Sequence, residues 1–413
     1  MEQFVARQPI FDRNLNVFAY ELLFRSRLVN FFDFNDGDQA SRQVIANSFL
    51  VFGIERMTVG SKAFINFTRG LLVDGYALAL PPEWVVVEIL EGILPDPEVL
   101  AACRELKAKG FTLALDDFVY DPVYEPLLDL ADIVKVDFLI SPEKERARLA
   151  KLLEKRGVTL LAEKIETRAE FEQALEMGFS LFQGYFFQKP VTLSQKDIPS
   201  LKLNNLRILS EVNAAELDFD GLAEIIGTDL SMSFKLLRYV NSAFFGYHSK
   251  IESIKHALAM MGENEVKKWV SLLSLAGLAD DKPAELVTSS LIRAKFCEKA
   301  APLIGYGGRD SELFLMGLFS LLHAIIDQPL DTVLEGIPLA EDLKDALLGR
   351  KPPGPLRLLL AVVQAWEKGD WVILGKIAQK LRLKENDLPE IYFEAVSFPR
   401  TVLSLAGGSG EAP

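Results

Sequence analysis

Side chains that can bind metal ions or move protons close successive apolar segments in the first half of the chain. They are Glu21, Asn66, Glu88, Asp116, Asp117, Lys135, Glu163 and Gln183. From Asn66 onward they stand about 20 to 28 residues apart, roughly the length of one strand, one helix and their loops. A repeating strand–helix unit gathers such strand ends on one rim. Oxygen ligands brought together there would bind Mg²⁺ or Mn²⁺ and support phosphate chemistry.

Five of these residues have the character of metal ligands. Hydrolysis of a phosphodiester by two metal ions requires a carboxylate that bridges the ions and further oxygens that fix them. Asp116 and Asp117 can serve as the bridge and as a ligand of the second ion. Glu21, Asn66 and Glu88 would complete the shell of the first ion. The sequence therefore predicts a two-metal site for Mg²⁺ or Mn²⁺.

The other three residues of the series suit the chemical step. Lys135 can hold the attacking hydroxide or offset negative charge on the phosphorane, and Glu163 and Gln183 can act on the second ion or its waters. Any single member of the series could equally cap a helix or bind loop amides. The order of all eight is what indicates a site.

Strand-like and helix-like segments alternate up to about residue 190. The pattern predicts helices over residues 39–57, 97–109, 143–156 and 168–177, and strands at Phe64 and over 84–90, 111–116, 133–136, 158–162 and 181–186. Alternation of this kind favours parallel strands joined by helices. This many of them predict an α/β fold, a closed TIM-type (β/α) barrel.

The pattern changes near Pro190. Alternating strands are almost absent beyond a polar stretch, and short helices broken by Gly and Pro follow. These helices are predicted over residues 204–214, 219–226, 231–239, 254–261, 263–278, 285–303 and 311–326, with shorter ones to 402. We expect a barrel domain over 1–198, an all-α helical domain over 199–400 and a flexible tail over 401–413.

Size, charge and cysteine content narrow the class of protein. The 413 residues predict two domains, and the formal net charge of −13 argues against binding a nucleic-acid polymer. The first residues lack an apolar core of signal-peptide length, and no apolar run approaches the roughly 18 residues of a membrane span. We therefore expect a cytoplasmic protein in which Cys103 and Cys297 form no disulfide.

Several segments resemble the EAL domain, a family of cyclic di-GMP phosphodiesterases with a TIM-type barrel. The matching segments are residues 20–25, 88–91, 115–118, 135–137, 162–163 and 183–190, together with Asn66. The resemblance covers most of residues 1–190 and implies cyclic di-GMP as the substrate. It implies that Glu21, Asn66, Glu88, Asp116 and Asp117 are metal ligands and that Lys135, Glu163 and Gln183 complete the catalytic set.

The same resemblance implies further residues that contact the nucleotide. They are Arg25, which would meet a ligand phosphate, Glu91, Asp137 and Glu166. A homodimer is one assembly that the resemblance allows.

Three positions depart from the EAL pattern. Leu22 replaces the usual Ala of the signature and is expected to crowd the barrel floor. Residues 119–124, Val-Tyr-Asp-Pro-Val-Tyr, replace a Gly-Thr-Gly-Tyr-Ser-Ser type of loop that positions metal and couples activity to dimer formation in the family. Lys164 replaces the Gly that follows the Ala-Glu motif. The altered loop bears most directly on turnover.

The second half resembles the HDOD domain, an all-α relative of the HD phosphohydrolases. The matching segments are residues 236–246, 253–258 with 261–262, and 317–323. An HD hydrolase needs an adjacent His-Asp pair and further His ligands, but this chain has three histidines and Ala324 follows His323. His256 and His323 are expected to be ordinary helix residues and His248 a loop residue. The domain is therefore expected to bind a signalling protein partner or to regulate the barrel.

Three functions remain open. The preferred one is metal-dependent hydrolysis of cyclic di-GMP to linear pGpG, with the HDOD domain controlling or targeting the barrel. The competing one is a catalytically weak or inactive EAL domain that acts as a cyclic di-GMP receptor or a protein scaffold. A sugar-processing barrel with Glu21 and Glu163 as an acid/base pair is a third, but it leaves Asp116, Asp117 and Lys135 without a role.

Overall fold

The chain divides into two compact units. The computed structural model describes residues 4–25, 54–189, 200–214, 216–228, 230–241 and 253–405. One unit comprises Met1–Lys189 and Ala365–Gly375, and the other Pro190–Gln364 and Lys376–Pro413. The expected boundary at residue 198 and the last eight residues of the expected tail lie outside the described residues, whereas residues 401–405 of that tail are helical. Ala365–Gly375, expected in the helical domain, belongs to the barrel unit.

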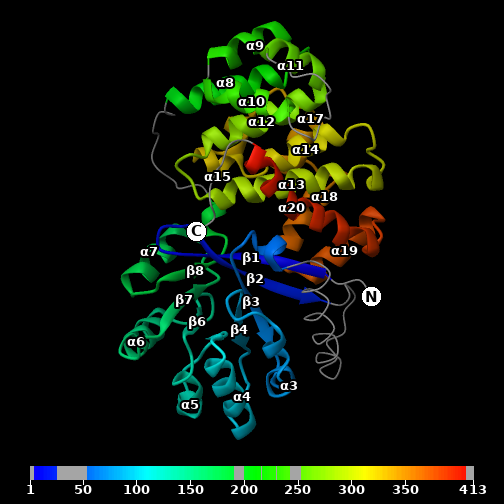
Figure 1. The fold of residues 1–413 in the computed structure, drawn as a ribbon. Coiled ribbons are helices and arrows are strands. Elements are labelled where there is room, and N and C mark those ends of the chain that lie inside the picture. Colours follow the sequence, from blue (N-terminus) through cyan, green and yellow to red (C-terminus); the bar gives the residue numbers. More distant parts are fainter. Residues whose placement is uncertain are drawn as a thin grey trace. The chain divides into compact units, whose positions relative to one another are not determined.

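Eight strands of the first unit close into a barrel (Figure 1). They are β1 (Phe4–Phe11), β2 (Val17–Arg25), β3 (Lys62–Phe67), β4 (Val85–Ile89), β5 (Thr112–Leu115), β6 (Ile133–Asp137), β7 (Thr159–Glu163) and β8 (Leu181–Gln183). The predicted TIM-type barrel is thus confirmed. Neighbours from β2 to β8 are parallel, but β1 is antiparallel to both β2 and β8.

The direction of β1 follows from the short connection to β2. The Asp12 carboxylate accepts hydrogen bonds from the backbone N–H groups of Asn14 and Asn16, at 2.8 and 2.9 Å. A turn this short can only reverse the chain, so the two strands form an antiparallel hairpin. The remaining strands are joined by longer connections that contain helices, and those strands run parallel.

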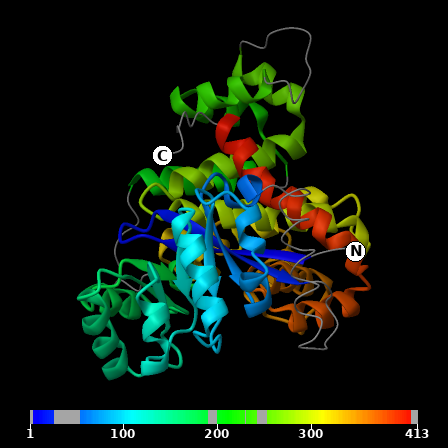
Figure 2. The same cartoon turned by 60° about the horizontal axis from the view of Figure 1, so that its bottom comes forward.

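Helices cover the outside of the barrel (Figures 1 and 2). They are α2 (Ile54–Thr58), α3 (Arg69–Val73), α4 (Pro97–Ala108), α5 (Glu125–Leu128), α6 (Glu143–Glu154) and α7 (Arg168–Glu176), with one-turn 3-10 helices η2 (Tyr76–Ala79), η3 (Pro122–Tyr124) and η4 (Phe186–Gln188). The prediction of α4, α6 and α7 is confirmed to within two residues at each end. Of the helix predicted over 39–57, only residues 54–57 are described.

Side chains from all eight strands fill the barrel interior with one apolar cluster. Its members are Ile10, Ala19, Phe64, Val86, Ala114, Ile133, Leu161 and Leu181, each at most 5% exposed. Successive side chains of a strand alternate between its two faces, so the next inward position lies two residues away. This spacing decides which side chains meet at the rim above the cluster.

The second unit is helical, as predicted. Its helices are α8 (Ser200–Val212), α9 (Phe219–Thr228), α10 (Leu230–Val240), α11 (Ile254–Met261), α12 (Glu263–Leu278), α13 (Ala284–Ala300), η5 (Pro302–Ile304), α14 (Asp310–Phe319), α15 (Leu322–Ile326), α16 (Leu330–Glu335), α17 (Glu341–Leu348), η6 (Glu385–Asp387) and α20 (Leu388–Leu405). Two more helices, α18 (Pro355–Glu367) and α19 (Trp371–Leu381), are divided between the units, because the end of α18 and the start of α19 lie in Ala365–Gly375. The single helix predicted over 311–326 is two helices. The long α20, red in Figure 2, packs on α13.

Two further expectations concern the whole chain. Cys103 and Cys297 are buried in different units and form no disulfide, as predicted. Among the described residues, every helix is too short or too polar to pass through a bilayer.

Gly184, which follows β8 directly, adopts φ +148°, and a Cβ there would overlap the backbone of Ile165. We expect Gly184→Ala to lower the stability of the barrel unit by about 3 kcal/mol, because the backbone must shift next to Gln183. Gly157→Ala is the matched control, because Gly157 has a φ of +69° and open space around it. This substitution should lower the free energy of unfolding by about 1–2 kcal/mol. Urea unfolding measures the stability of both variants. Equal losses of stability would contradict the close approach of Gly184 to the backbone of Ile165.

Candidate active site

A layer of polar side chains lies directly above the apolar cluster of the barrel. Seven strands contribute the residue two positions beyond their cluster member, toward the carboxyl end. These residues are Glu21, Asn66, Glu88, Asp116, Lys135, Glu163 and Gln183. The sequence-predicted series is therefore gathered at the carboxyl-terminal rim, the usual place of an active site in this architecture. Glu21 lies within β2 rather than at its end, because β2 continues to Arg25.

The ammonium group of Lys135 is at the centre of this layer. Its Nζ lies 2.6 Å from Glu88 Oε1, 2.7 Å from Asp116 Oδ1, 2.8 Å from Glu163 Oε1 and 3.7 Å from Glu21 Oε2. The side chain of Lys135 is only 1% exposed. A buried ammonium is stable only where opposite charges surround it. Four carboxylates from four different strands provide that charge.

Amide side chains extend the network on the β1–β2 side. Gln183 Nε2 donates to Glu21 Oε2 at 2.6 Å and to Gln8 Oε1 at 3.1 Å, and Asn66 Nδ2 donates to Glu21 Oε1 at 3.2 Å. Sequence reasoning missed Gln8. Because β1 runs antiparallel, its inward residue at this level precedes the cluster residue Ile10 instead of following it, so the spacing used for the other strands could not find it.

Several buried oxygen atoms of the layer accept no hydrogen bond from any described residue. They are Asn66 Oδ1, Glu88 Oε2, Glu163 Oε2 and Gln183 Oε1. Leaving a buried acceptor without a donor or a cation costs free energy. All four are hard oxygen donors, and two of them belong to the predicted metal ligands Asn66 and Glu88. The donor set therefore fits a divalent cation such as Mg²⁺ or Mn²⁺.

Burial and charge shift the protonation of this layer. Burial raises the pKa of Glu88 well above its ordinary value, against the opposing effect of Lys135. Burial also raises the pKa of Glu163 to about 8, again opposed by Lys135. Burial lowers the pKa of Lys135, but the surrounding carboxylates outweigh it and raise that pKa well above its ordinary value. Lys135 thus stays charged, while Glu163 can exchange a proton near neutral pH.

A second group of ligand atoms lies at the edge of the layer. Carboxylate oxygens of Asp116, Asp117 and Glu163 come within 4.8 Å of one another. Asp117 adopts φ +41°, an uncommon value for a residue other than Gly. Lys164 adopts φ +56° and forms ion pairs with Asp117 and with Asp137, a side chain that is 3% exposed.

The remaining predicted ligand-binding residues are spread around the rim. Arg25 ends β2 and is half-buried, and Glu91 is exposed in the turn after β4. Glu166 is exposed and pairs with Lys189 at 3.3 Å. Asp137 accepts hydrogen bonds from the backbone N–H groups of Leu139 and Ile140. Their roles toward a nucleotide stay predictions.

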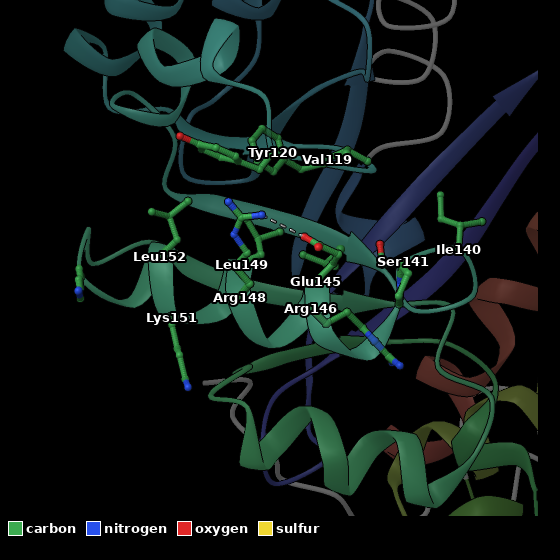
Figure 3. A pocket seen from close by; sticks show the side chains of 14 residues that line it. Val119, Tyr120, Ile140, Ser141, Glu145, Arg146, Arg148, Leu149, Lys151 and Leu152 are labelled. Atoms are coloured by element: carbon green, nitrogen blue, oxygen red, sulfur yellow. Dashed lines mark ion pairs between the residues drawn. The ribbon is translucent and has the colours of Figure 1, made fainter.

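The loop that departs from the EAL pattern has its own local contacts. Phe118 N donates to Lys135 O at 2.9 Å, and Tyr120 Oη donates to Glu125 Oε1 at 2.7 Å. The loop borders a cavity of about 550 Å³. Figure 3 shows Val119 and Tyr120 across this cavity from Arg148 and other side chains of α6. The cavity is lined by none of the eight residues of the predicted series.

Leu22 does not crowd the barrel floor, contrary to the expectation. It follows Glu21, which faces the interior, so alternation places Leu22 on the outer face of β2. It pairs in register with Arg7 and Ile65, which also neighbour inward-facing residues, and it is 1% exposed. The larger side chain is therefore accommodated against the outside of the barrel.

Among the described residues of the helical unit, the histidines belong to no candidate metal-binding group. His256 is exposed in the first turn of α11 and His323 is half-buried in α15, while His248 lies outside the described residues. Within the ranges described, this unit contains no group of three or more His, Cys, Asp or Glu residues with ligand atoms close together.

The fold and the rim together define a class: (β/α) barrels with a carboxylate-ringed lysine at the carboxyl ends of their strands, joined to an all-α unit. Models of two families match the chain, the EAL domain over residues 50–190 and the HDOD domain over 198–330. The cyclic di-GMP phosphodiesterase CdgJ of Vibrio cholerae is 37% identical over 408 residues, 97% of this chain and 93% of CdgJ. The chain therefore belongs to the family of two-domain EAL–HDOD proteins.

Further similarities cover the whole chain or part of it. The uncharacterized protein YuxH of Bacillus subtilis is 36% identical over 406 residues, 96% of this chain and 98% of YuxH. Among solved structures, the calcium and cyclic di-GMP complex of Klebsiella pneumoniae BlrP1 is 24% identical with a TM-score of 0.39. That match covers 45% of this chain and 55% of BlrP1.

Replacing Lys135 tests whether its charge holds the layer together. We expect Lys135→Met to lower the free energy of unfolding by about 3–5 kcal/mol in the presence of EDTA, because four carboxylates lose their buried counter-charge. Lys107→Met is the matched control, since Lys107 pairs with Asp132 at the surface with side chains 34% and 37% exposed. That pair is worth about 0–1 kcal/mol. Thermal unfolding compares the two variants, and similar decreases in melting temperature would contradict the central role of Lys135.

Proposed function

We propose that this protein is a divalent-metal-dependent phosphodiesterase that opens cyclic di-GMP to linear pGpG. The observation that carries the proposal is the ring of four carboxylates around the buried Lys135, beside buried oxygens that accept no hydrogen bond from the described residues. Family membership supports it, because CdgJ, similar over nearly the whole chain, is named a cyclic di-GMP phosphodiesterase.

The first metal position in this proposal is formed by Glu21, Asn66, Glu88 and Asp116. Their oxygens come from three neighbouring strands, β2 to β4, and from the residue directly after β5. Carboxylate and amide oxygens suit Mg²⁺ or Mn²⁺. A divalent ion bound there supplies positive charge that polarises a phosphoryl oxygen of the substrate.

The protein's own side chains supply the proton transfer and further charge stabilisation. Hydrolysis forms a bond from a water oxygen to phosphorus, breaks one ester P–O bond and leaves a hydroxyl on the ribose. Glu163 Oε2 is free of protein donors among the described residues, so the deprotonated Glu163 can take the proton of the attacking water and return it to the leaving ribose oxygen. Lys135 offsets the negative charge that develops on the phosphorane, and Gln183 holds the orientation of Glu21.

The proposal assigns the outer rim and the helical unit to binding and control. Arg25, Glu91, Asp137 and Glu166 would contact the nucleotide, and the HDOD domain would bind a signalling partner. The proposal includes the cytoplasmic location that the sequence predicts, and it allows a homodimer, as the family resemblance does.

A receptor without turnover is the second candidate, favoured by the altered loop after Asp117. That loop is fixed by local contacts such as the Asp121 carboxylate, which accepts a hydrogen bond from Val123 N at 2.9 Å. The ligand residues of the layer are nevertheless assembled, which favours hydrolysis. Nucleotide binding in the absence of turnover would support the receptor.

Hydrolysis of cyclic di-GMP by the full-length protein tests the proposal. We expect linear pGpG with Mg²⁺ or Mn²⁺ and none with EDTA. Glu21→Gln and Asp116→Asn should each lower kcat roughly a hundredfold or more, since even residues that support metal ligands affect activity ten- to hundredfold. Glu98→Gln, an exposed carboxylate paired with Arg69, is the control and should keep full activity.

Binding of cyclic di-GMP is measured in the same samples. Product from the wild-type protein alone establishes the enzyme. Binding without product would contradict the enzyme and favour the receptor, and loss of both would favour a scaffold.

A further inference from the structure

Lys164 places a second ammonium group at the edge of the candidate metal site. It follows Glu163, the last residue of β7, and its Nζ lies 3.3 Å from Asp117 Oδ1 and 3.4 Å from Asp117 Oδ2. The same Nζ donates to Asp137 Oδ2. The ammonium thus bridges the carboxylates of two different strand ends, after β5 and at the end of β6.

The carboxylate that Lys164 contacts is one that a second metal ion would need. Asp117 belongs to the group in which carboxylate oxygens of Asp116, Asp117 and Glu163 approach within 4.8 Å. An ammonium and a divalent ion cannot occupy the same face of one carboxylate, because like charges repel strongly at short range. Binding of a second ion on Asp117 would therefore have to displace Lys164.

The backbone holds Lys164 in this position. Its φ of +56° is uncommon for a residue with a Cβ. Ile165, the next residue, donates its N–H to Gln183 O at 3.0 Å and accepts from Phe186 N at 3.2 Å, so the chain is fixed immediately after Lys164. On the other side, β7 pairs with β6 up to Glu163. The main chain of Lys164 is thus anchored on both sides, while its side chain is 46% exposed.

Asp137 makes the position of the Lys164 Nζ favour an ammonium group over a divalent ion. Its side chain is 3% exposed, and Oδ1 already accepts hydrogen bonds from Leu139 N at 2.6 Å and Ile140 N at 3.2 Å. Its other oxygen, Oδ2, is the acceptor for Lys164. A buried carboxylate retains a paired cation strongly, because removing that cation would leave its charge uncompensated.

We propose that the Lys164 ammonium takes the place of the second metal ion, so that the site binds one divalent ion tightly and uses Lys164 as its second positive charge. This inference rests on the metal site of the proposed function. In the one-metal site, Asp116 and the ligands of β2 to β4 hold the ion, and Lys164 pairs with both Asp117 and Asp137.

Counting bound Mn²⁺ tests the inference independently of activity. Titration of the full-length protein, followed by the loss of free-Mn²⁺ signal in electron paramagnetic resonance, gives the number of ions and their affinities. We expect one tight ion in the wild-type protein. Lys164→Gly and Lys164→Gln should gain a second ion or bind it at least tenfold more tightly, because Asp117 becomes available. Gly also suits the positive φ.

Two control variants make the count specific. Lys164→Arg keeps the positive charge and should keep one tight ion. Lys107→Gln removes a surface lysine from its pair with Asp132 and should leave the count unchanged. Thermal unfolding confirms that each variant is folded before the titration.

Three outcomes would overturn the inference. Two equally tight ions in the wild-type protein would show that Lys164 does not exclude the second. One ion in the wild-type protein and in both neutral variants would overturn the role of Lys164 alone and leave the proposed function intact. No tight ion in any variant would overturn the metal site itself and, with it, the proposed function.

Discussion

The structure of the candidate site depends on one buried ammonium group. Lys135 is surrounded by carboxylates from β2, β4, the end of β5 and β7, at distances of 2.6 to 3.7 Å. Charges so close together inside a protein are tolerated only when the backbone holds each one in place. The barrel does this because each strand carries its polar residue two positions beyond a member of the apolar cluster.

The crowding of carboxylates around Lys135 also explains why the site suits a cation. Four acidic side chains around one lysine leave negative charge in excess, and several oxygens of the layer accept no hydrogen bond within the described part of the chain. A divalent ion would meet both needs at once. At the edge of the layer, a second ammonium group, that of Lys164, forms ion pairs with Asp117 and with the buried Asp137.

Much of this arrangement could be predicted from the sequence, since apolar runs followed by Glu, Asp, Asn or Lys mark strands that end at one rim. The polar residues that close the apolar runs identified seven members of the layer but not Gln8, because β1 runs antiparallel and its inward residue precedes the apolar one. The one-turn helices α3 and α5 are too short to show a helical period. The place of Ala365–Gly375 in the barrel unit depends on non-local contacts, such as the hydrogen bond from Trp366 Nε1 to Val5 O at 3.0 Å.

The central claim is that the layer around Lys135 is a metal site, and anomalous diffraction at the manganese absorption edge tests it most directly. Crystals of the full-length protein grown with Mn²⁺ are predicted to show an anomalous peak bonded to oxygens of Glu21, Asn66, Glu88 and Asp116, with Lys135 still charged beside it. A map with manganese at surface carboxylates but no peak within this layer would contradict the account.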